Sequence, residues 1–257
     1  MNPVLSIIIL LLVSLYLFFK LKKKPVKVLP ISDQYKAILT AEVPFYRELG
    51  IGKKKEFEHR LQRFLATVKI TGVNTIVEDI DKVLIAASAI IPIFNFSDWE
   101  YPNLNEVLLY PDSFNHDFDQ VGDERNILGM VGTGAFNNVM ILSQFELRQA
   151  FTNLTGKRNT AIHEFVHLID KTDGSIDGIP TAILEKKYIL PWLQLMRQKI
   201  EEIRNDDSDI ADYGATNESE FFAVVSEYFF ERPDLLQDKH PDLYALLIKI
   251  FRHQPKL

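Results

Sequence analysis

Residues 159–170 read NTAIHEFVHLID and place two histidines, His163 and His167, four residues apart. No Pro or Gly interrupts this stretch, and Asn159 is a suitable N-cap, so we expect a helix. Residues four apart on a helix lie one turn above the other, so both imidazoles can bind one metal ion. Most other positions are apolar, which predicts a buried helix whose polar side chains must have partners.

The residue types of this helix fit zinc. Tetrahedral zinc accepts imidazole nitrogen, and three protein ligands leave a fourth position for water. Glu164 directly follows the first histidine, where its carboxylate can take a proton from that water. The alternative, two ordinary histidines around a solvated glutamate, suits a polar surface helix better than this one. We therefore expect one Zn²⁺ ion per chain, with His163 and His167 as ligands.

The third ligand is expected from residues 212–230, DYGATNESEFFAVVSEYFF, because none of the other histidines lies in a supporting pattern. Glu220 and Glu227 are seven residues apart and share one face of a largely apolar helix. A carboxylate on such a helix must be paired or metal-bound. Spacing leaves both glutamates open as ligands, and with Asn217 as N-cap, Glu220 has the alternative role of a capping-box residue.

Two aspartates after the histidines are candidates for supporting them. Asp170 and Asp173 are placed to accept an imidazole N–H, as carboxylates behind metal-bound histidines often do. The alternative for both is helix termination and turn chemistry.

The N-terminus predicts a membrane anchor. Residues 4–19, VLSIIILLLVSLYLFF, are almost continuously apolar and approach the length that spans a bilayer as a helix. No charge precedes them, whereas five lysines follow by position 27, which is opposite to the charge order of a signal peptide. We expect a single-pass helix over residues 1–20, a basic linker over 21–31, and the domain of residues 32–257 facing the cytoplasm.

Composition excludes some classes of function. The chain has 257 residues, of which 47% are apolar, and no cysteine, so it has a large core and no disulfide or thiolate ligand. Residues 28–257 carry 24 basic and 35 acidic residues, a net charge of −11. Such a domain repels nucleic acid, and we expect no nucleic-acid partner.

The order of elements predicts one helix-rich α+β domain with a small sheet. Apolar spacing predicts helices over 33–40, 53–67, 77–91, 143–151, 182–204, 218–230 and 241–251. Strands are expected over 69–76, 107–110 and 138–142. Pro92 should end the third helix, Pro191 should break or restart the fifth, and Pro233 should lie in a connection. Residues 112–134 are polar and turn-rich, so we expect a long loop there.

Several runs together resemble the Mlc titration factor A family of zinc metallopeptidases. They are NVMILS at 138–143, NTAIHEFVHLID at 159–170 and DYGATNESEFFAVVSEYFFERPDLL at 212–236, with LQRFL, DKVLIAASAIIPIF and VLLYPDSF upstream. The resemblance covers residues 34–251 and implies a gluzincin with a zincin-like fold, similar to the catalytic domain of lethal-factor-type toxins. It further implies His163, His167 and Glu220 as zinc ligands, Glu164 as general base, and Tyr213 as a residue that stabilises the developing oxyanion.

These observations predict a zinc-dependent peptidase acting on a peptide or protein substrate. The alternative is a zinc-stabilised binding module that sequesters a cytoplasmic regulator, since the resembled family is associated with a transcriptional repressor. Glu164 favours the enzyme, because a purely structural zinc site needs no carboxylate beside its ligand and usually has a fourth protein ligand. The N-terminal anchor departs from the soluble members of that family.

Overall fold

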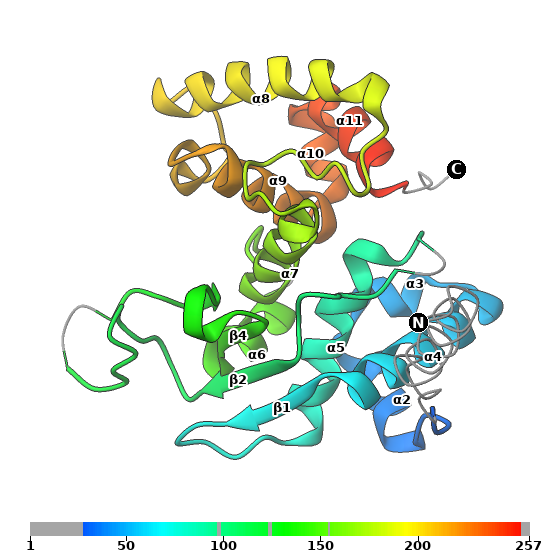
Figure 1. Cartoon of the computed structure of the whole chain (residues 1–257). Coiled ribbons are helices and arrows are strands. Elements are labelled where there is room, and N and C mark those ends of the chain that lie inside the picture. The colour runs from blue at the N-terminus through cyan, green and yellow to red at the C-terminus, as the bar shows by residue number, and fades with distance from the viewer. Residues whose placement is uncertain (1–27, 97–98, 123–124, 154, 253–257) are drawn as a thin grey trace, which may run out of the picture.

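The protein is a helix-rich α+β molecule with a small mixed sheet (Figure 1). The structure, a computed structural model, describes residues 28–96, 99–122, 125–153 and 155–252. The first part contains α2 (Asp33–Glu42), α3 (Pro44–Glu48), α4 (Ile51–Thr67), β1 (Lys69–Gly72), α5 (Asp79–Ile93), β2 (Glu106–Tyr110), β3 (Gly129–Val131), the 3-10 helix η1 (Gly134–Phe136), β4 (Val139–Ser143) and α6 (Gln144–Thr152). The second contains α7 (Thr160–Asp170), η2 (Lys171–Asp173), η3 (Lys186–Tyr188), α8 (Ile189–Arg204), η4 (Asp212–Ala215), α9 (Glu218–Glu231), α10 (Pro233–Lys239) and α11 (Pro241–Phe251).

The sheet has the strand order β1-β2-β4-β3. β1, β2 and β4 run parallel, with Val107 of β2 opposite Met140 of β4. β3 runs antiparallel to β4, with Met130 opposite Ile141, and forms one edge of the sheet. The backbone groups on the outer side of β3 therefore have no strand partner among the described residues, and a sheet edge of this kind can pair with another extended chain.

Helix α7 stands at the centre of the molecule, between the layer of the sheet with α2–α5 and the layer of α8–α11 (Figure 1). All its residues from Ala161 to Asp170 are buried, as its apolar composition predicts. Asn159 caps it by accepting a hydrogen bond from the backbone N–H of Ile162. On one side Phe165 packs against the rings of Phe64 and Tyr101. This packing holds the histidine face of the helix in a fixed position.

Three expectations about the elements are wrong in detail. Pro92 does not end α5 before it; the helix continues to Ile93, with the proline in its last turn. Residues 182–188 form turns and η3 rather than helix, and α8 begins at Ile189, so Pro191 lies in its first turn, where a proline is tolerated. The connection with Pro233 is the short helix α10, which the proline starts.

The expected long loop over residues 112–134 contains strand β3. It also contains an antiparallel bridge between Phe114 and Ile127, whose backbone groups exchange two hydrogen bonds of 3.0 Å. The strand has only three residues among turn-forming ones, so its alternation was too short to detect. The strand expected over 69–76 is shorter, since β1 ends at Gly72, and the other expected helices and strands are present with small shifts of their ends.

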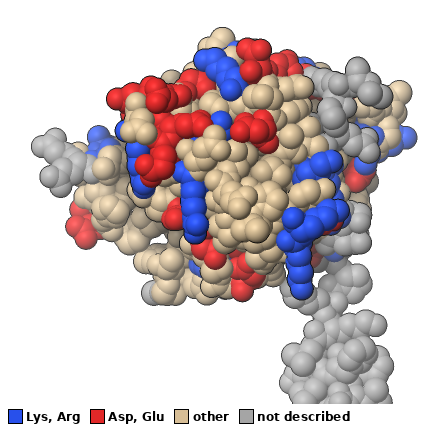
Figure 2. Space-filling model, turned by 90° about the horizontal axis from the view of Figure 1, so that it is seen from above, with Lys and Arg blue, Asp and Glu red and all other residues tan. Residues whose placement is uncertain are grey.

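The expected transmembrane helix over residues 1–20 and most of the linker over 21–31 lie outside the described residues. Within the described part of the chain, no helix is long and apolar enough to cross a membrane. Figure 2 shows one face of the molecule, on which Asp and Glu side chains gather at the upper left, Lys and Arg side chains lie among them and toward the right, and the centre is largely uncharged.

Candidate metal centre

Three potential ligand atoms converge between α7 and α9. The Nε2 atoms of His163 and His167 lie 3.0 Å apart. Oε2 of Glu220, from the first turn of α9, lies 3.0 Å from Nε2 of His163 and 3.4 Å from Nε2 of His167. Donor atoms around a tetrahedral zinc at ~2.0–2.1 Å are roughly 3.3 Å apart, so the spacing of these three atoms fits such an ion.

The hydrogen bonds behind the ligands orient both imidazoles. Nδ1 of His163 lies 2.7 Å from Oε1 of Glu227, which accepts its N–H. Nδ1 of His167 lies 3.0 Å from the Ser219 hydroxyl, which can accept in the same way. In these tautomers both Nε2 atoms present lone pairs toward the Glu220 carboxylate. Three acceptors that meet without a donor require a cation, so the donor set fits Zn²⁺.

The electrostatics of the protein also favour positive charge at this point. Burial would lower the pKa of His163, but the negative charge of Glu227 and hydrogen bonds to Glu220 and Glu227 raise it to about 10. Burial would raise the pKa of Glu220, but its hydrogen bonds with His163 and His167 lower it to about 2. The place between the imidazoles and the carboxylate thus holds a proton or, in competition with it, a metal cation.

Glu164 lies beside these ligands without belonging to the three-atom cluster. It is 5% exposed, and burial raises the pKa of its carboxyl group, although His163 and His167 oppose that shift. Its side chain lies against β3: a Cβ atom placed on Gly129 would come within 2.8 Å of Cγ and 2.9 Å of Oε1 of Glu164. The glycine therefore allows the edge strand to approach the carboxylate closely.

Tyr213 lies on η4, next to the ligands. Its ring centroid is 6.0 Å from that of His163, and the residue is 58% exposed. Partial burial and the negative charge of Glu220 raise the pKa of the Tyr213 hydroxyl, so it stays protonated near neutral pH and can donate a hydrogen bond.

Two cavities meet at His163, Glu164 and Tyr213. One, of about 680 Å³, extends along Met130 and Val131 toward His167 and Leu193. The other, of about 770 Å³, extends from Ile127 and Leu128 toward α9 and the residues before α7. The first cavity runs along β3 and the second reaches its first residue, Gly129, so an extended chain lying beside this strand would pass in front of Glu164.

The structure brings together all five predicted site residues, namely His163, Glu164, His167, Tyr213 and Glu220. It also distinguishes the two glutamates that spacing left open as ligands. Glu220 faces the Nε2 atoms of both histidines, whereas Glu227 faces Nδ1 of His163. Asn217 caps α9, because its side chain accepts a hydrogen bond from the backbone N–H of Glu220.

The expectation that Asp170 or Asp173 supports an imidazole is wrong. Asp170 accepts from the backbone N–H of Gly178, and burial raises its pKa to about 6. Asp173 accepts from Ser175 and Thr181 in the turn that follows. Sequence reasoning missed Ser219, whose position directly before Glu220 was the only available signal.

The buried pair of histidines and the glutamate from a second helix form a candidate metal centre, an arrangement that fits the metallopeptidase class. The chain belongs to the glucose-regulated metallo-peptidase M90 family, whose model matches residues 18–252. It is 30% identical over 237 residues to the uncharacterized protein slr2042 of Synechocystis sp., covering 88% of this chain and 86% of that protein. It is 28% identical to Mlc titration factor A of Pectobacterium atrosepticum, over 69% of this chain and 70% of the relative, and 24% identical to that of Escherichia fergusonii, over 84% of both.

Proposed function

We propose that this chain is a zinc-dependent peptidase with a zincin-like fold, in which Glu164 is the general base. The observation that carries the proposal is the position of this carboxylate. It is buried beside the three ligand atoms, takes no part in their cluster, and lies against the edge strand of an open cleft. A site that only stabilises the fold needs neither a cleft nor an additional carboxylate.

Each residue then has a defined role. His163, His167 and Glu220 hold the ion, which when bound supplies Lewis acidity toward water and the scissile carbonyl. Glu164 takes a proton from the attacking water and returns it to the leaving amine; its raised pKa brings the carboxyl closer to the working pH. The Tyr213 hydroxyl donates a hydrogen bond to the carbonyl oxygen as negative charge develops.

The edge strand supplies the binding surface for the peptide. Among the residues that the structure describes, β3 pairs on one side only, with β4, and it borders both cavities. An extended substrate can add to it as a further strand, using backbone hydrogen bonds that do not depend on sequence. In the proposed complex, the scissile bond would lie in front of Glu164.

The names of several relatives favour an alternative. Those called Mlc titration factor A are named for a partner. The second proposal is therefore a zinc-stabilised module that sequesters a cytoplasmic regulator such as a transcriptional repressor. Both activities can exist in one protein, but only the peptidase requires Glu164 to be ionisable.

Hydrolysis of a fluorogenic peptide library at matched zinc content separates the two proposals. Glu164→Gln should lower kcat/KM by ~10²–10⁴-fold, because an amide cannot accept the proton of water. Tyr213→Phe should lower it by ~10²–10³-fold through loss of one donor to the oxyanion. Glu201→Gln and Tyr188→Phe, outside both cavities, are the matched controls and should leave it unchanged.

Zinc content and far-ultraviolet circular dichroism should be the same in all five proteins. Unchanged cleavage by the Glu164→Gln protein would show that the base lies elsewhere or that the activity is a contaminant's. If the zinc-loaded wild type cleaves no peptide of the library, the binding module replaces the peptidase.

A further inference from the structure

The cavity of about 770 Å³ is lined partly by apolar side chains and partly by charged ones. Its apolar wall includes Ile127, Leu128 and Val224. Its charged side chains come from the segment before α7, from Glu164 on α7 itself, from the loop before η4, and from α9. A charged side chain that is already paired within the protein is not available to a ligand, so the unpaired charges of the cavity determine which ligand groups it can bind.

Two carboxylates of this cavity are already satisfied by internal donors. Glu227 accepts from Nδ1 of His163 and, through its second oxygen, from the backbone N–H of Asn159 at 2.6 Å. Asp209 accepts from the side chains of Lys157, Tyr228 and His240 at 2.6–2.9 Å. These hydrogen bonds hold the pKa of Asp209 well below its usual range, although its partial burial opposes the shift.

Lys157 also has partners within the protein. Its Nζ atom donates to the backbone oxygen and to the carboxylate of Asp209, and it lies 4.4 Å from the ring centroid of Tyr228. Arg158 differs from it. Its side chain is exposed and lines the cavity, and it has no hydrogen bond or ion pair with any other residue that the structure describes. A guanidinium remains charged at every physiological pH.

The backbone that carries Arg158 is held on both sides. The next residue, Asn159, is fully buried; its side chain caps α7 and donates to Glu231 at 2.8 Å. On the other side, Arg232 donates a hydrogen bond to the backbone oxygen of Thr155. A charge on such a support can discriminate between ligands, because little of the backbone has to be ordered on binding.

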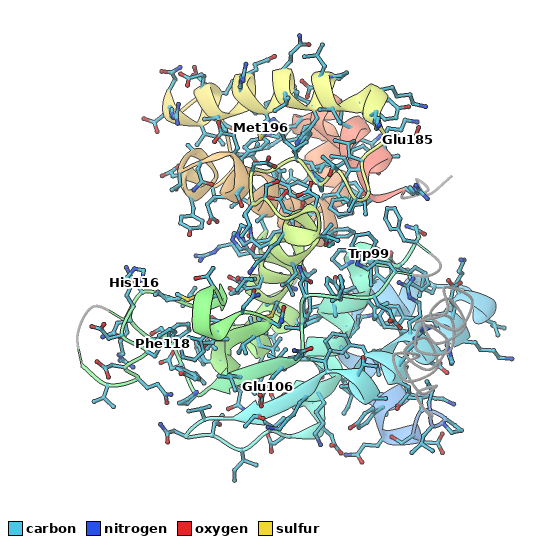
Figure 3. All side chains as sticks on the ribbon, viewed as in Figure 1. Trp99, Glu106, His116, Phe118, Glu185 and Met196 are labelled. Atoms are coloured by element: carbon cyan, nitrogen blue, oxygen red, sulfur yellow. The ribbon has the colours of Figure 1, made fainter. Side chains whose placement is uncertain are left out.

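A second donor comes from the loop between β2 and β3. His116 borders both cavities, and the described residues offer its side chain no hydrogen bond. Its neighbour Asn115 accepts from the backbone N–H groups of Asp117 and Asp119, and Phe114 is fully buried, so this loop is also anchored. His116 projects from the top of its loop toward the upper layer of helices (Figure 3).

We propose that this cavity receives an acidic side chain of the peptide substrate, with Arg158 as the specificity-determining residue and His116 as a second donor. The inference rests on the proposed function, because it assigns a substrate class to the same cleft. A guanidinium and a carboxylate form paired hydrogen bonds, which an amide of the same shape cannot match. Of the three carboxylates that line the cavity, Glu227 and Asp209 have other partners, and Glu164 is buried and forms no ion pair with Arg158.

The test measures binding rather than turnover, so it is independent of hydrolysis. The Glu164→Gln chain at full length, loaded with zinc in a nonionic detergent, is titrated into fluorescently labelled alanine hexapeptides. One series carries a single Glu at each position in turn, and matched series carry Gln, Leu or Lys there. At its best position the Glu peptide should bind about tenfold more tightly than its Gln partner.

Arg158→Gln should reduce this preference to less than twofold, and Arg158→Glu should shift it to the Lys series. Arg197→Gln, an exposed arginine on α8 outside both cavities, makes the same change of charge and should retain the preference. His116→Gln should weaken binding of the Glu peptide by a few fold. Because Arg158 is exposed, circular dichroism should show all four variants folded.

Equal binding of the Glu and Gln series at every position, a stronger preference for Leu, or a preference that survives Arg158→Gln would each overturn the proposal. So would a failure of all peptides to bind. Hydrolysis by the zinc-loaded wild type is measured separately. A charge preference in binding without any hydrolysis would refute the peptidase and retain the acidic subsite, whereas hydrolysis without charge preference would do the reverse.

Discussion

Replacing Glu227 by glutamine tests how the protein tunes its metal ligands. In the wild type, one oxygen of Glu227 accepts from Nδ1 of His163 and the other from the backbone N–H of Asn159, at 2.7 and 2.6 Å. A glutamine offers one oxygen and one NH2 group, so one of these N–H groups would lose its acceptor and face a donor. The negative charge behind His163 would also be removed.

Loss of such a supporting carboxylate typically weakens metal binding by ~10–100-fold, and we expect a change of this size in the zinc dissociation constant. Glu220→Gln replaces a charged ligand by a neutral and poorer one, so its effect should be larger. Glu231→Gln is the matched control, since Glu231 accepts from Nδ2 of Asn159 without touching either histidine, and an amide oxygen can accept the same hydrogen bond.

Competition with a chromophoric zinc chelator, at one pH for all four proteins, gives the affinities. We expect zinc affinity to be highest in the wild type and the Glu231→Gln protein, lower in Glu227→Gln, and lowest in Glu220→Gln. Zinc affinity of the Glu227→Gln protein within twofold of the wild type would refute the supporting role. A larger loss in Glu227→Gln than in Glu220→Gln would show that the roles of the two glutamates are exchanged.

Two further predictions concern pH and membrane topology. Burial and the charge of Glu227 raise the pKa of Glu231 to about 7, above its value of about 4.3 in an unfolded chain. The stability that the protonated carboxyl group contributes is therefore present below pH ~4 and is lost as the pH rises through 7. In denaturant titrations, Glu231→Gln should show a smaller fall in the free energy of unfolding between pH 5 and 8, and an unchanged fall would contradict the assignment. We also propose that residues 4–19 anchor the chain in the membrane with its domain in the cytoplasm. Protease added to intact cells should then spare the domain, and high salt should not extract the protein from membranes. Degradation of the domain from outside would show the opposite orientation.

The sequence could predict the parts of the site that lie on single helices. The spacing of His163 and His167 and the apolar character of the residues around them determine a buried helix with both imidazoles on one face. The same reasoning placed Glu220 and Glu227 on one face of α9. It could not choose between them, because the choice depends on how α9 packs across α7, which is a contact between residues more than fifty positions apart.

The parts that sequence reasoning missed depend on such long-range contacts. Ser219 contacts His167 only because the first turn of α9 packs against the part of α7 that carries this histidine. β3 is a strand because β4 supplies its partner, and its three residues carry too little pattern of their own. Gly129 of this strand lies against Glu164, and it can do so only because it has no side chain, which no sequence pattern indicates.

Gly129 connects the edge strand to the proposed base, and replacing it should damage catalysis without removing the metal. A Cβ atom there would lie 2.8 Å from Cγ2 of Thr160, 2.8 Å from Cγ of Glu164 and 2.9 Å from its Oε1, so either the Glu164 carboxylate or β3 must shift. A misplacement of about 1 Å can cost ~10²-fold in rate. We therefore expect Gly129→Ala to lower kcat/KM by about that factor.

The three atoms nearest to the added carbon belong to Thr160 and Glu164 and not to the proposed zinc ligands, so zinc affinity of the Gly129→Ala protein should stay within a few fold of the wild type. Gly52→Ala, in α4 with no atom within 4 Å of the added carbon, controls for the loss of a glycine and should change neither property. Peptide hydrolysis and chelator competition on the three proteins separate the effects. Wild-type turnover in the Gly129→Ala protein would mean that the carboxylate tolerates displacement, and Glu164 would then no longer qualify as a positioned base.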